Sequence, residues 1–273
     1  MEQLTVIIPT IQKNIEVLQE LLAILDADDV VHEIILIDNS LQGFNNIYSK
    51  LKVITPKKNL FVNPSWNLGV KESKTQYFAL FNDDLLVCRN FCTKVMNLIV
   101  KKTDIGILGM DVNSVINTLD MSLPEETDFQ LVKEDKNQLR PNNWGTIIFG
   151  KKELYNTIPR CLKIMCGDDY LRYMVWENNQ SVYDLMGAKV KHLGSISCSS
   201  KEFIKIGQRE IIRYAKIDKN YKKTSSYIWA KREQSVIRKF LQFIFSLKNT
   251  SDKRHKVITL LGFKFKIRRG INQ

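Results

Sequence analysis

The chain has 273 residues, of which 44% are hydrophobic, and it carries a formal net charge of +12. This length and hydrophobic content suffice for one large domain, or for one domain with an appendage. The sequence contains no run of about 18 apolar residues, so no membrane-spanning helix is expected. The five cysteines are odd in number and include no C-x-x-C pair, which argues against a disulfide framework and against a zinc site. The start, MEQLTVIIPT, has an acidic residue at position 2 and predicts a first strand, not a signal peptide.

The charge is distributed unevenly along the chain. Residues 201–273 contain 20 Lys and Arg against 5 Asp and Glu, whereas residues 1–200 contain 21 against 24. A nearly neutral region is therefore followed by a strongly basic one, which indicates an anionic partner such as a membrane, a nucleic acid or another polyanion. We predict a domain over residues 1–200 and a basic extension over residues 201–273.

Strands and helices are expected to alternate in the first part of the chain. Apolar runs rich in β-branched residues predict strands, and apolar residues at helical spacing predict helices. The expected strands are residues 4–10, 32–40, 51–56, 76–84 and 104–110, and the expected helices are residues 14–25, 63–74 and 90–101. Residues 111–143 are polar and predict a loop-rich excursion, before strand and helix resume over 144–155. This order predicts an α/β fold with a mainly parallel sheet and helices on both faces.

The fourth expected strand ends in an acidic step, Asn82-Asp83-Asp84. Adjacent carboxylates repel each other, and an apolar surround makes each charge more costly. Ligands of open α/β sheets bind beyond the carboxyl ends of the strands, where Pro9-Thr10 and Asp38-Asn39-Ser40 are also expected. A Mg²⁺ or Mn²⁺ ion between the carboxylates and a diphosphate would relieve the repulsion. These residues therefore predict a metal–diphosphate site, with ordinary turn or helix-cap roles as the alternative.

Taken in order, TVIIPT, EIILIDNS, NLFVNPSWNLGV and YFALFNDD resemble the nucleotide-binding half of glycosyltransferase family 2. The resemblance covers roughly residues 3–200 and implies the Rossmann-like GT-A fold, a nucleotide-diphospho-sugar donor and a metal-binding motif of the D-x-D type. It implies Asp84 as the main ligand of Mn²⁺ or Mg²⁺. The first position of the motif is Asn82 here, a departure that leaves the contributions of Asn82 and Asp83 to metal binding open. The nucleotide contacts implied by the resemblance are Pro9, Thr10, Asp38, Asn39, Asn59, Asn67, Asn82 and Asp83.

A second acidic pair, Asp168-Asp169, opens an expected helix after a glycine. An acidic helix start is favoured by the helix dipole alone. In the family, Glu-Asp precedes a helix at this place, and the Asp is the general base of an inverting transfer. The resemblance therefore implies Asp169 as the base, with Asp168 as the second candidate.

The resemblance also implies roles for three residues outside the acidic steps. Trp144 and Gly145 would line the donor-sugar or acceptor pocket. His192 would approach the metal or the diphosphate. A place in the core is the alternative for Trp144, and a structural role is the alternative for His192.

The basic extension contains two segments in which apolar and basic residues follow a regular order. Residues 235–248 place apolar side chains on one helical face, so the extension is expected to be helical, and residues 254–270 alternate apolar with basic residues. Such segments suit an anionic membrane surface, and they resemble the tails of bacterial surface-polysaccharide transferases with lipid-linked acceptors. Packing on the domain, or on a second copy in a homodimer, is the alternative. Nucleic acid is not expected, because no nucleic-acid motif accompanies the charge.

We therefore expect an inverting, metal-dependent glycosyltransferase that moves a sugar to a glycan or lipid-linked acceptor. Its setting would be bacterial surface-polysaccharide synthesis, of capsule or lipopolysaccharide, and its location cytoplasmic and peripheral at the inner face of the cytoplasmic membrane. One alternative is a phosphotransfer domain, although its acid pair would be expected on the first strand. The other is a non-catalytic, transferase-like module that binds membrane or polyanion through its basic extension.

Overall fold

The computed structural model describes residues 2–136, 143–194, 201–232, 244–249, 255–261 and 263–268. The chain divides into two compact units, Met1–Glu210 and Ile211–Gln273. Helix α5, Lys201–Tyr214, contains the end of the first unit and the start of the second. The predicted division after residue 200 stays a prediction.

The first unit is built on an eight-stranded sheet of order β3-β2-β1-β4-β9-β6-β10-β8. Strands β3, β2, β1 and β4 run parallel, as do β6 and β10, whereas β9 and β8 are antiparallel to their neighbours. The predicted α/β fold with a mainly parallel sheet is confirmed. The strands are β1 Leu4–Thr10, β2 Val31–Asp38, β3 Leu51–Ile54, β4 Tyr77–Phe81, β6 Ile105–Met110, β8 Gln130–Lys133, β9 Ile147–Lys151 and β10 Ser181–Met186.

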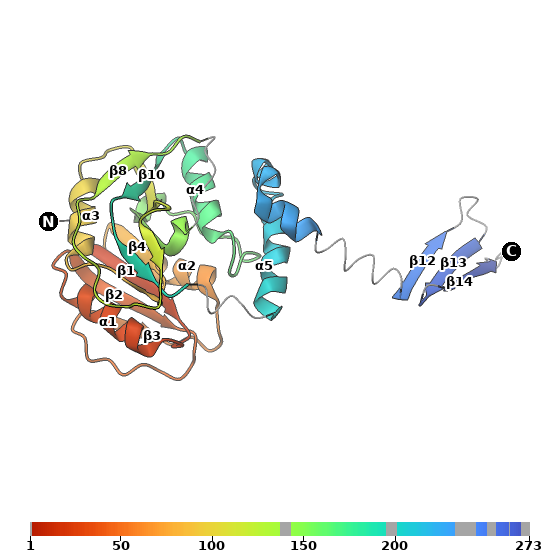
Figure 1. The fold of residues 1–273 in the computed structure, drawn as a ribbon, viewed down its shortest axis with the longest axis horizontal. Helices are drawn as coiled ribbons and strands as arrows, with labels where there is room; N and C mark the ends of the chain where they lie inside the picture. Colours follow the sequence, from red (N-terminus) through yellow and green to blue (C-terminus); the bar gives the residue numbers. More distant parts are fainter. Residues whose placement is uncertain are drawn as a thin grey trace. The chain divides into compact units, whose positions relative to one another are not determined.

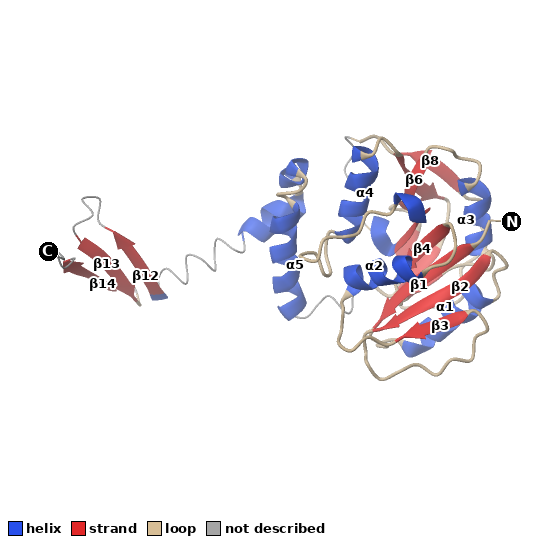
Figure 2. Cartoon of the chain, turned by 180° about the vertical axis from the view of Figure 1, so that it is seen from behind, coloured by secondary structure: helices blue, strands red, loops and turns tan. Residues whose placement is uncertain are grey.

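Helices cover both faces of this sheet, as the alternation of elements predicts (Figure 1 and Figure 2). Helices α1 (Ile15–Asp26) and α3 (Phe91–Ile99) bury their apolar sides in one large core with alternate strand residues. Helix α2 (Val62–Glu72) packs on the opposite face. There Gly69 approaches Ile7 so closely that a Cβ atom at Gly69 would lie 2.3 Å from the isoleucine side chain. Helix α4 (Gly167–Glu177) packs against β6 and β10.

The region predicted to be a loop-rich excursion contains strands as well. Strands β7 (Val115–Asn117) and β8 lie within residues 111–143, so the prediction is wrong at these two places, and residues 137–142 lie outside the described residues. Strand β7 joins β5 (Leu85–Leu86) and β11 (Val190–His192) in a small second sheet of order β5-β11-β7. This small sheet fixes the chain directly after the acidic step.

The second unit contains strands where a helix was expected. Strands β12 (Phe245–Asn249), β13 (His255–Leu260) and β14 (Phe263–Arg268) form an antiparallel sheet, so the predicted helix over 235–248 is wrong from residue 245 onward. Residues 235–243 lie outside the described residues. In FSLKN the apolar residues Phe245 and Leu247 lie two apart, which is the period of a strand.

Two further observations concern membrane crossing and cysteine pairing. None of the helices in the described ranges combines the length and the hydropathy that a membrane crossing requires. No disulfide joins the four described cysteines, Cys88, Cys92, Cys161 and Cys166.

Candidate active site

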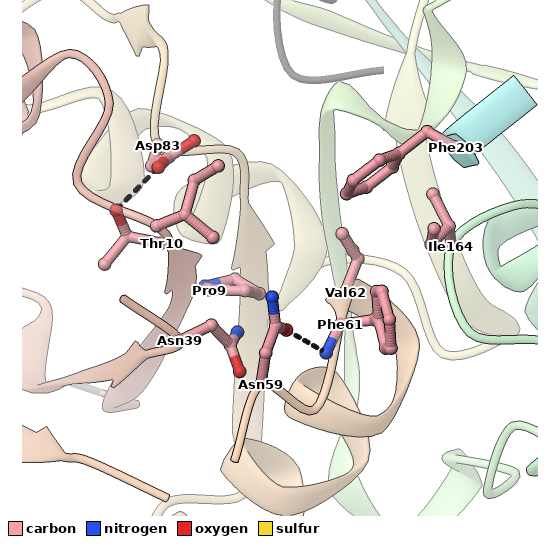
Figure 3. A pocket seen from close by; sticks show the side chains of 10 residues that line it. Pro9, Thr10, Asn39, Asn59, Phe61, Val62, Asp83, Ile164 and Phe203 are labelled. Carbon is pink, nitrogen blue, oxygen red and sulfur yellow. Dashed lines mark hydrogen bonds between the residues drawn. The ribbon is translucent and has the colours of Figure 1, made fainter. Parts of the chain in front are cut away.

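A pocket opens where strands β1, β2 and β4 end (Figure 3). The space within it, counted together with the part that is open to solvent, is about 480 Å³. One wall is polar and comes from the strand ends, and the other is apolar and comes from the start of α2, the segment before α4, and α5. The lining residues are Pro9, Thr10, Ile11, Asn39, Asn59, Phe61, Val62, Asp83, Ile164 and Phe203. The structure therefore brings five of the eight predicted nucleotide-contact residues together.

The polar wall contains a short contact between the ends of β1 and β4. The buried Thr10 donates a hydrogen bond of 2.6 Å from Oγ1 to Asp83 Oδ2. Burial, together with the negative charge of Asp84, raises the pKa of Asp83 to about 6, although the bond from Thr10 acts in the opposite direction. An ionised Asp83 is thus held at a free-energy cost, which a bound cation would reduce.

The loop after β2 is held by the carboxylate of Asp38. This carboxylate is fully buried and accepts hydrogen bonds from the backbone N–H groups of Ser40 and Gly43, both at 2.9 Å. Burial raises the pKa of Asp38, but the hydrogen bonds from Ser40, Gln12 and Gly43 outweigh burial, so the pKa lies below its ordinary value. Asp38 is therefore ionised at neutral pH. It does not line the pocket, and its predicted nucleotide contact stays a prediction.

Two asparagines that line the pocket fix the surrounding chain through side-chain hydrogen bonds. Asn39 accepts the N–H of Leu60 at 2.8 Å and donates to Ser65 Oγ at 3.0 Å, which ties the end of β2 to the start of α2. Asn59 accepts the N–H of Phe61 at 2.7 Å. Both side chains line the pocket, as Figure 3 shows.

The apolar wall is centred on Phe61, which precedes α2. Its φ of +68° lies in the left-handed region that bulky residues rarely adopt, and such strain often occurs at functional sites. The ring of Phe61 lies edge-on to that of Phe203, with 6.2 Å between centroids, and Lys163 Nζ lies 5.2 Å from the Phe61 centroid. Pattern analysis of the sequence did not identify this aromatic pair, because 142 residues separate its members.

Beside this pocket, the small sheet brings His192 to Asp84. Pairing of β11 with β5 sets His192 opposite Leu85, and His192 Nε2 lies 3.1 Å from Asp84 Oδ1. The other ring nitrogen, Nδ1, lies 2.9 Å from Asn117 Oδ1 on β7. Both His192 and Asp84 are buried. The two residues predicted to bind metal are thus in contact with each other.

The donor set of this pair fits a divalent cation. In the tautomer that carries its proton on Nδ1, this nitrogen donates to Asn117 and the lone pair of Nε2 is available to a metal, whereas a protonated ring forms an ion pair with Asp84. Adjacent ligands of an octahedral ion with bonds of about 2.1 Å lie about 3 Å apart, which agrees with the 3.1 Å between Nε2 and Oδ1. Among the described residues, no cluster of three or more His, Cys, Asp or Glu side chains could hold a metal. The remaining ligands would have to come from the substrate and water.

The second acidic pair lies in the first turn of α4, after a residue with left-handed backbone, Cys166 (φ +59°). Asp169 is buried, and Asp168 is half-buried and accepts the N–H of Asp169 at 2.9 Å. A Cβ atom at Gly145 would lie 2.3 Å from Asp168 Oδ2, so the backbone at Gly145 packs directly on this carboxylate. The structure therefore brings Gly145 to the predicted general-base pair.

Three predicted site residues have contacts elsewhere, and none of them lines the pocket. Trp144 is fully buried, packs on Gly109 and donates a hydrogen bond of 2.9 Å to Asp184. Asn67 accepts from the Tyr155 hydroxyl at 2.7 Å and exchanges hydrogen bonds with the backbone of residue 158. Asn82 donates its N–H to the carbonyl of Thr146. Their predicted roles stay predictions.

Comparison with protein-family models gives one match. The model described as glycosyl transferase family 2 matches residues 5–158, more than half of the chain. The matched region contains β1, β2, β4 and the acidic step. Comparison with curated proteins gives no significant match.

Solved structures with a similar fold include S. aureus TarS and GalNAc-T7. S. aureus TarS has a TM-score of 0.52 at 16% identity, covering 78% of this chain and 40% of that chain. TarS 1–349 in complex with UDP has a TM-score of 0.51 at 16% identity, covering 77% and 65%. GalNAc-T7, crystallised with UDP, GalNAc and Mn²⁺, has a TM-score of 0.56 at 14% identity, covering 81% and 50%. The present chain thus spans between 40% and 65% of these proteins.

Proposed function

Because this chain belongs to glycosyl transferase family 2 and has the GT-A fold, we propose that it transfers a sugar from a nucleoside-diphosphate sugar. The observation that carries the proposal is the pocket at the ends of β1, β2 and β4, lined by Thr10, Asn39 and Asp83. It lies where ligands of open α/β sheets bind. The UDP in complexes of structural neighbours makes uridine nucleotides the first donors to test.

The pair formed by Asp84 and His192 would hold Mn²⁺ or Mg²⁺ on the diphosphate. The 3.1 Å contact between a carboxylate oxygen and an imidazole nitrogen supports this assignment, as does the Mn²⁺ in the GalNAc-T7 structure. The chemistry supplied there would be neutralisation of the charge on the departing diphosphate. Asp83 would then become easier to ionise, because a nearby cation favours the charged carboxylate.

We assign the general base of an inverting transfer to Asp169, with Asp168 as the second candidate. The carboxylate would accept the proton of the acceptor hydroxyl while the hydroxyl oxygen attacks the anomeric carbon. The bond from that carbon to the diphosphate oxygen breaks on the opposite side, which inverts the configuration. The position of the pair at the start of α4, four and five residues after pocket-lining Ile164, supports this assignment.

A nucleotide panel tests the donor proposal without knowledge of the acceptor. Nucleoside mono- and diphosphates of uridine, guanosine, thymidine, cytidine and adenosine are added with Mn²⁺ or with EDTA, and the melting temperature is recorded. A ligand that binds only the folded state raises this temperature. We expect one nucleoside diphosphate to give the largest rise, only with the metal. A panel without any metal-dependent rise would contradict the proposal and favour the non-catalytic alternative.

We propose further that the acceptor is lipid-linked, in bacterial surface-polysaccharide synthesis, and that the second unit binds the cytoplasmic face of the membrane. Opposed residues of antiparallel strands share a face, so the pairs Ile258–Phe265 and Leu260–Phe263 form one apolar patch. Leu260, Phe263 and Phe265 are 49%, 73% and 54% exposed. The net positive charge of residues 201–273 would attract an anionic leaflet, while the apolar patch enters the interface.

Sedimentation of the full chain with anionic vesicles tests the membrane proposal. The double variant Phe263→Ser/Phe265→Ser should lose most vesicle binding, whereas Ile47→Ser, at an exposed position of the first unit, should bind like the wild type. High salt should release only part of the wild-type protein, since only the electrostatic contribution is screened. Equal binding by the double variant would contradict the proposal. A concentration-dependent dimer that the double variant abolishes would instead assign the patch to a second copy.

A further inference from the structure

The carboxylate of Glu210, in the last part of α5, binds three consecutive backbone amides. Oε1 accepts the N–H of Lys163 at 2.8 Å, and Oε2 accepts those of Ile164 at 2.9 Å and Met165 at 2.8 Å. Glu210 is 1% exposed. Loss of this buried carboxylate would leave three backbone amides without their acceptor.

The segment held by Glu210, residues 163–165, leads directly into the acidic pair of α4. Its carbonyl groups are held from the other side by Asn63 of α2, which donates its backbone N–H to Lys163 O at 2.9 Å and its side-chain amide to Met165 O at 3.2 Å. Gly167 packs on the same asparagine, because a Cβ atom at Gly167 would lie 2.1 Å from Asn63 Oδ1. The segment is thus fixed between α2 and α5: Asn63 of α2 donates hydrogen bonds to its carbonyl groups, and Glu210 of α5 accepts hydrogen bonds from its N–H groups.

Helix α5 also contributes to the pocket itself. Phe203 lies two turns before Glu210 on this helix, lines the pocket and contacts the ring of Phe61. Ile164, whose N–H binds Glu210, lines the same wall (Figure 3). One helix therefore contacts both the candidate donor pocket and the segment that leads to the candidate base.

We propose that Glu210 is a positioning residue for catalysis: it fixes residues 163–165, and through them the acidic start of α4, relative to the donor pocket. The inference rests on the proposed function, since it takes the α4 pair to be the base. A shift of about 1 Å at a reacting group can lower a rate about 100-fold. The catalytic unit therefore extends to Glu210, ten residues beyond the division predicted from the charge distribution.

The test compares Glu210→Gln with two controls in the full chain. An amide at this position keeps the size of the side chain but turns a donor toward at least one of the three N–H groups. Arg209→Gln changes the exposed neighbour on the same helix. Ile99→Ala lowers stability from α3, on the opposite face of the sheet from α2, and so reports what destabilisation alone does. Each variant is measured for amide hydrogen exchange at residues 163–165, affinity for the nucleoside diphosphate with Mn²⁺, and kcat and KM.

For Glu210→Gln we expect faster exchange at the three amides, nucleotide affinity within about twofold of the wild type, and kcat lowered about 10- to 100-fold. Unchanged exchange, or a kcat no lower than that of Ile99→Ala, would overturn the proposal. A wild-type chain that binds no nucleoside diphosphate would contradict the proposed function. The exchange measurement would still decide separately whether Glu210 fixes the segment.

Discussion

Replacement of Asp83 by Asn should stabilise the metal-free protein at neutral pH. The carboxylate lies at the end of β4 beside Asp84, and among the described residues its side-chain donor is Thr10. Asn has nearly the same shape, can still accept the Thr10 hydrogen bond through its amide oxygen, and carries no charge. The change therefore isolates the free energy of holding an ionised carboxylate in the candidate metal site.

The magnitude follows from the pKa of Asp83. Burial first, and the charge of Asp84 second, raise this pKa from 3.8 to about 6. Each pKa unit corresponds to about 1.36 kcal/mol, so ionisation at pH 7.5 lowers the free energy of unfolding by about 3 kcal/mol. Between pH 4 and 6 the folded state binds more protons than the unfolded state, so this contribution to stability falls as the pH rises. The advantage of Asp83→Asn should grow from about 1 kcal/mol at pH 4.5 to about 3 kcal/mol at pH 7.5.

Urea denaturation in EDTA at pH 4.5, 5.5 and 7.5 measures this difference. Asp29→Asn, at an exposed position, is the matched control and should change the free energy of unfolding by less than about 0.5 kcal/mol throughout. Equal stability of Asp83→Asn and wild type at pH 7.5 would refute the reasoning, and so would an advantage that grows as the pH falls. Saturating Mn²⁺ with nucleoside diphosphate should reduce or reverse the advantage, because the cation favours the carboxylate.

Three further predictions follow from the site. Asp84→Ala should weaken nucleoside diphosphate binding in Mn²⁺ by at least about 10-fold in calorimetry. In EDTA the variant and the wild type should bind the nucleotide with similar affinity. Equal affinity of the two in Mn²⁺ would show that Asp84 is not a metal ligand. Asp169→Asn should leave nucleotide affinity unchanged and lower kcat about 100- to 10,000-fold, because the amide accepts no proton; full turnover, with the loss found in Asp168→Asn instead, would move the base to Asp168. Trp144→Phe should lower the free energy of unfolding by about 1–3 kcal/mol, since Asp184 loses a buried donor. The same variant should keep nucleotide affinity, and a loss of affinity at full stability would favour the predicted pocket role of Trp144.

The main sheet could be predicted largely because its strands are buried on both sides. Runs such as VIIP and FALF are apolar throughout, and each is followed by polar residues at the carboxyl end of its strand. The antiparallel insertion of β9 between β4 and β6 could not be predicted, because apolar periodicity identifies a strand but not its neighbours. Strands β7 and β8 were missed because they are short, with few buried residues to produce a pattern. The predicted helix over 235–248 failed at residue 245 because Leu247 follows Phe243 at helical spacing and Phe245 at strand spacing, so the apolar spacing does not separate the two periods.

The site could be predicted where its residues follow a strand, and not where they come from distant elements. Pro9, Thr10, Asn39 and Asp83 lie at strand ends and converge because parallel strands end at one edge. Phe203 and Glu210 lie in the part of the chain that was separated from the domain by its charge. One signal was present, because Glu210 is among only five acidic residues in the last 73. An acidic residue in such a basic segment is a candidate for a specific buried contact.

The most direct test of the central proposal is a donor screen read by mass spectrometry. The full chain is incubated with Mn²⁺ and a panel of nucleoside-diphosphate sugars, and the released nucleoside diphosphate is quantified against the same reactions with Asp84→Ala. The account predicts that the wild type slowly releases nucleoside diphosphate from one class of donor by hydrolysis. The release should become faster when a lipid-linked or glycan acceptor is supplied. Asp84→Ala should release nucleoside diphosphate in neither case. Release from no donor, or equal release by Asp84→Ala, would contradict it.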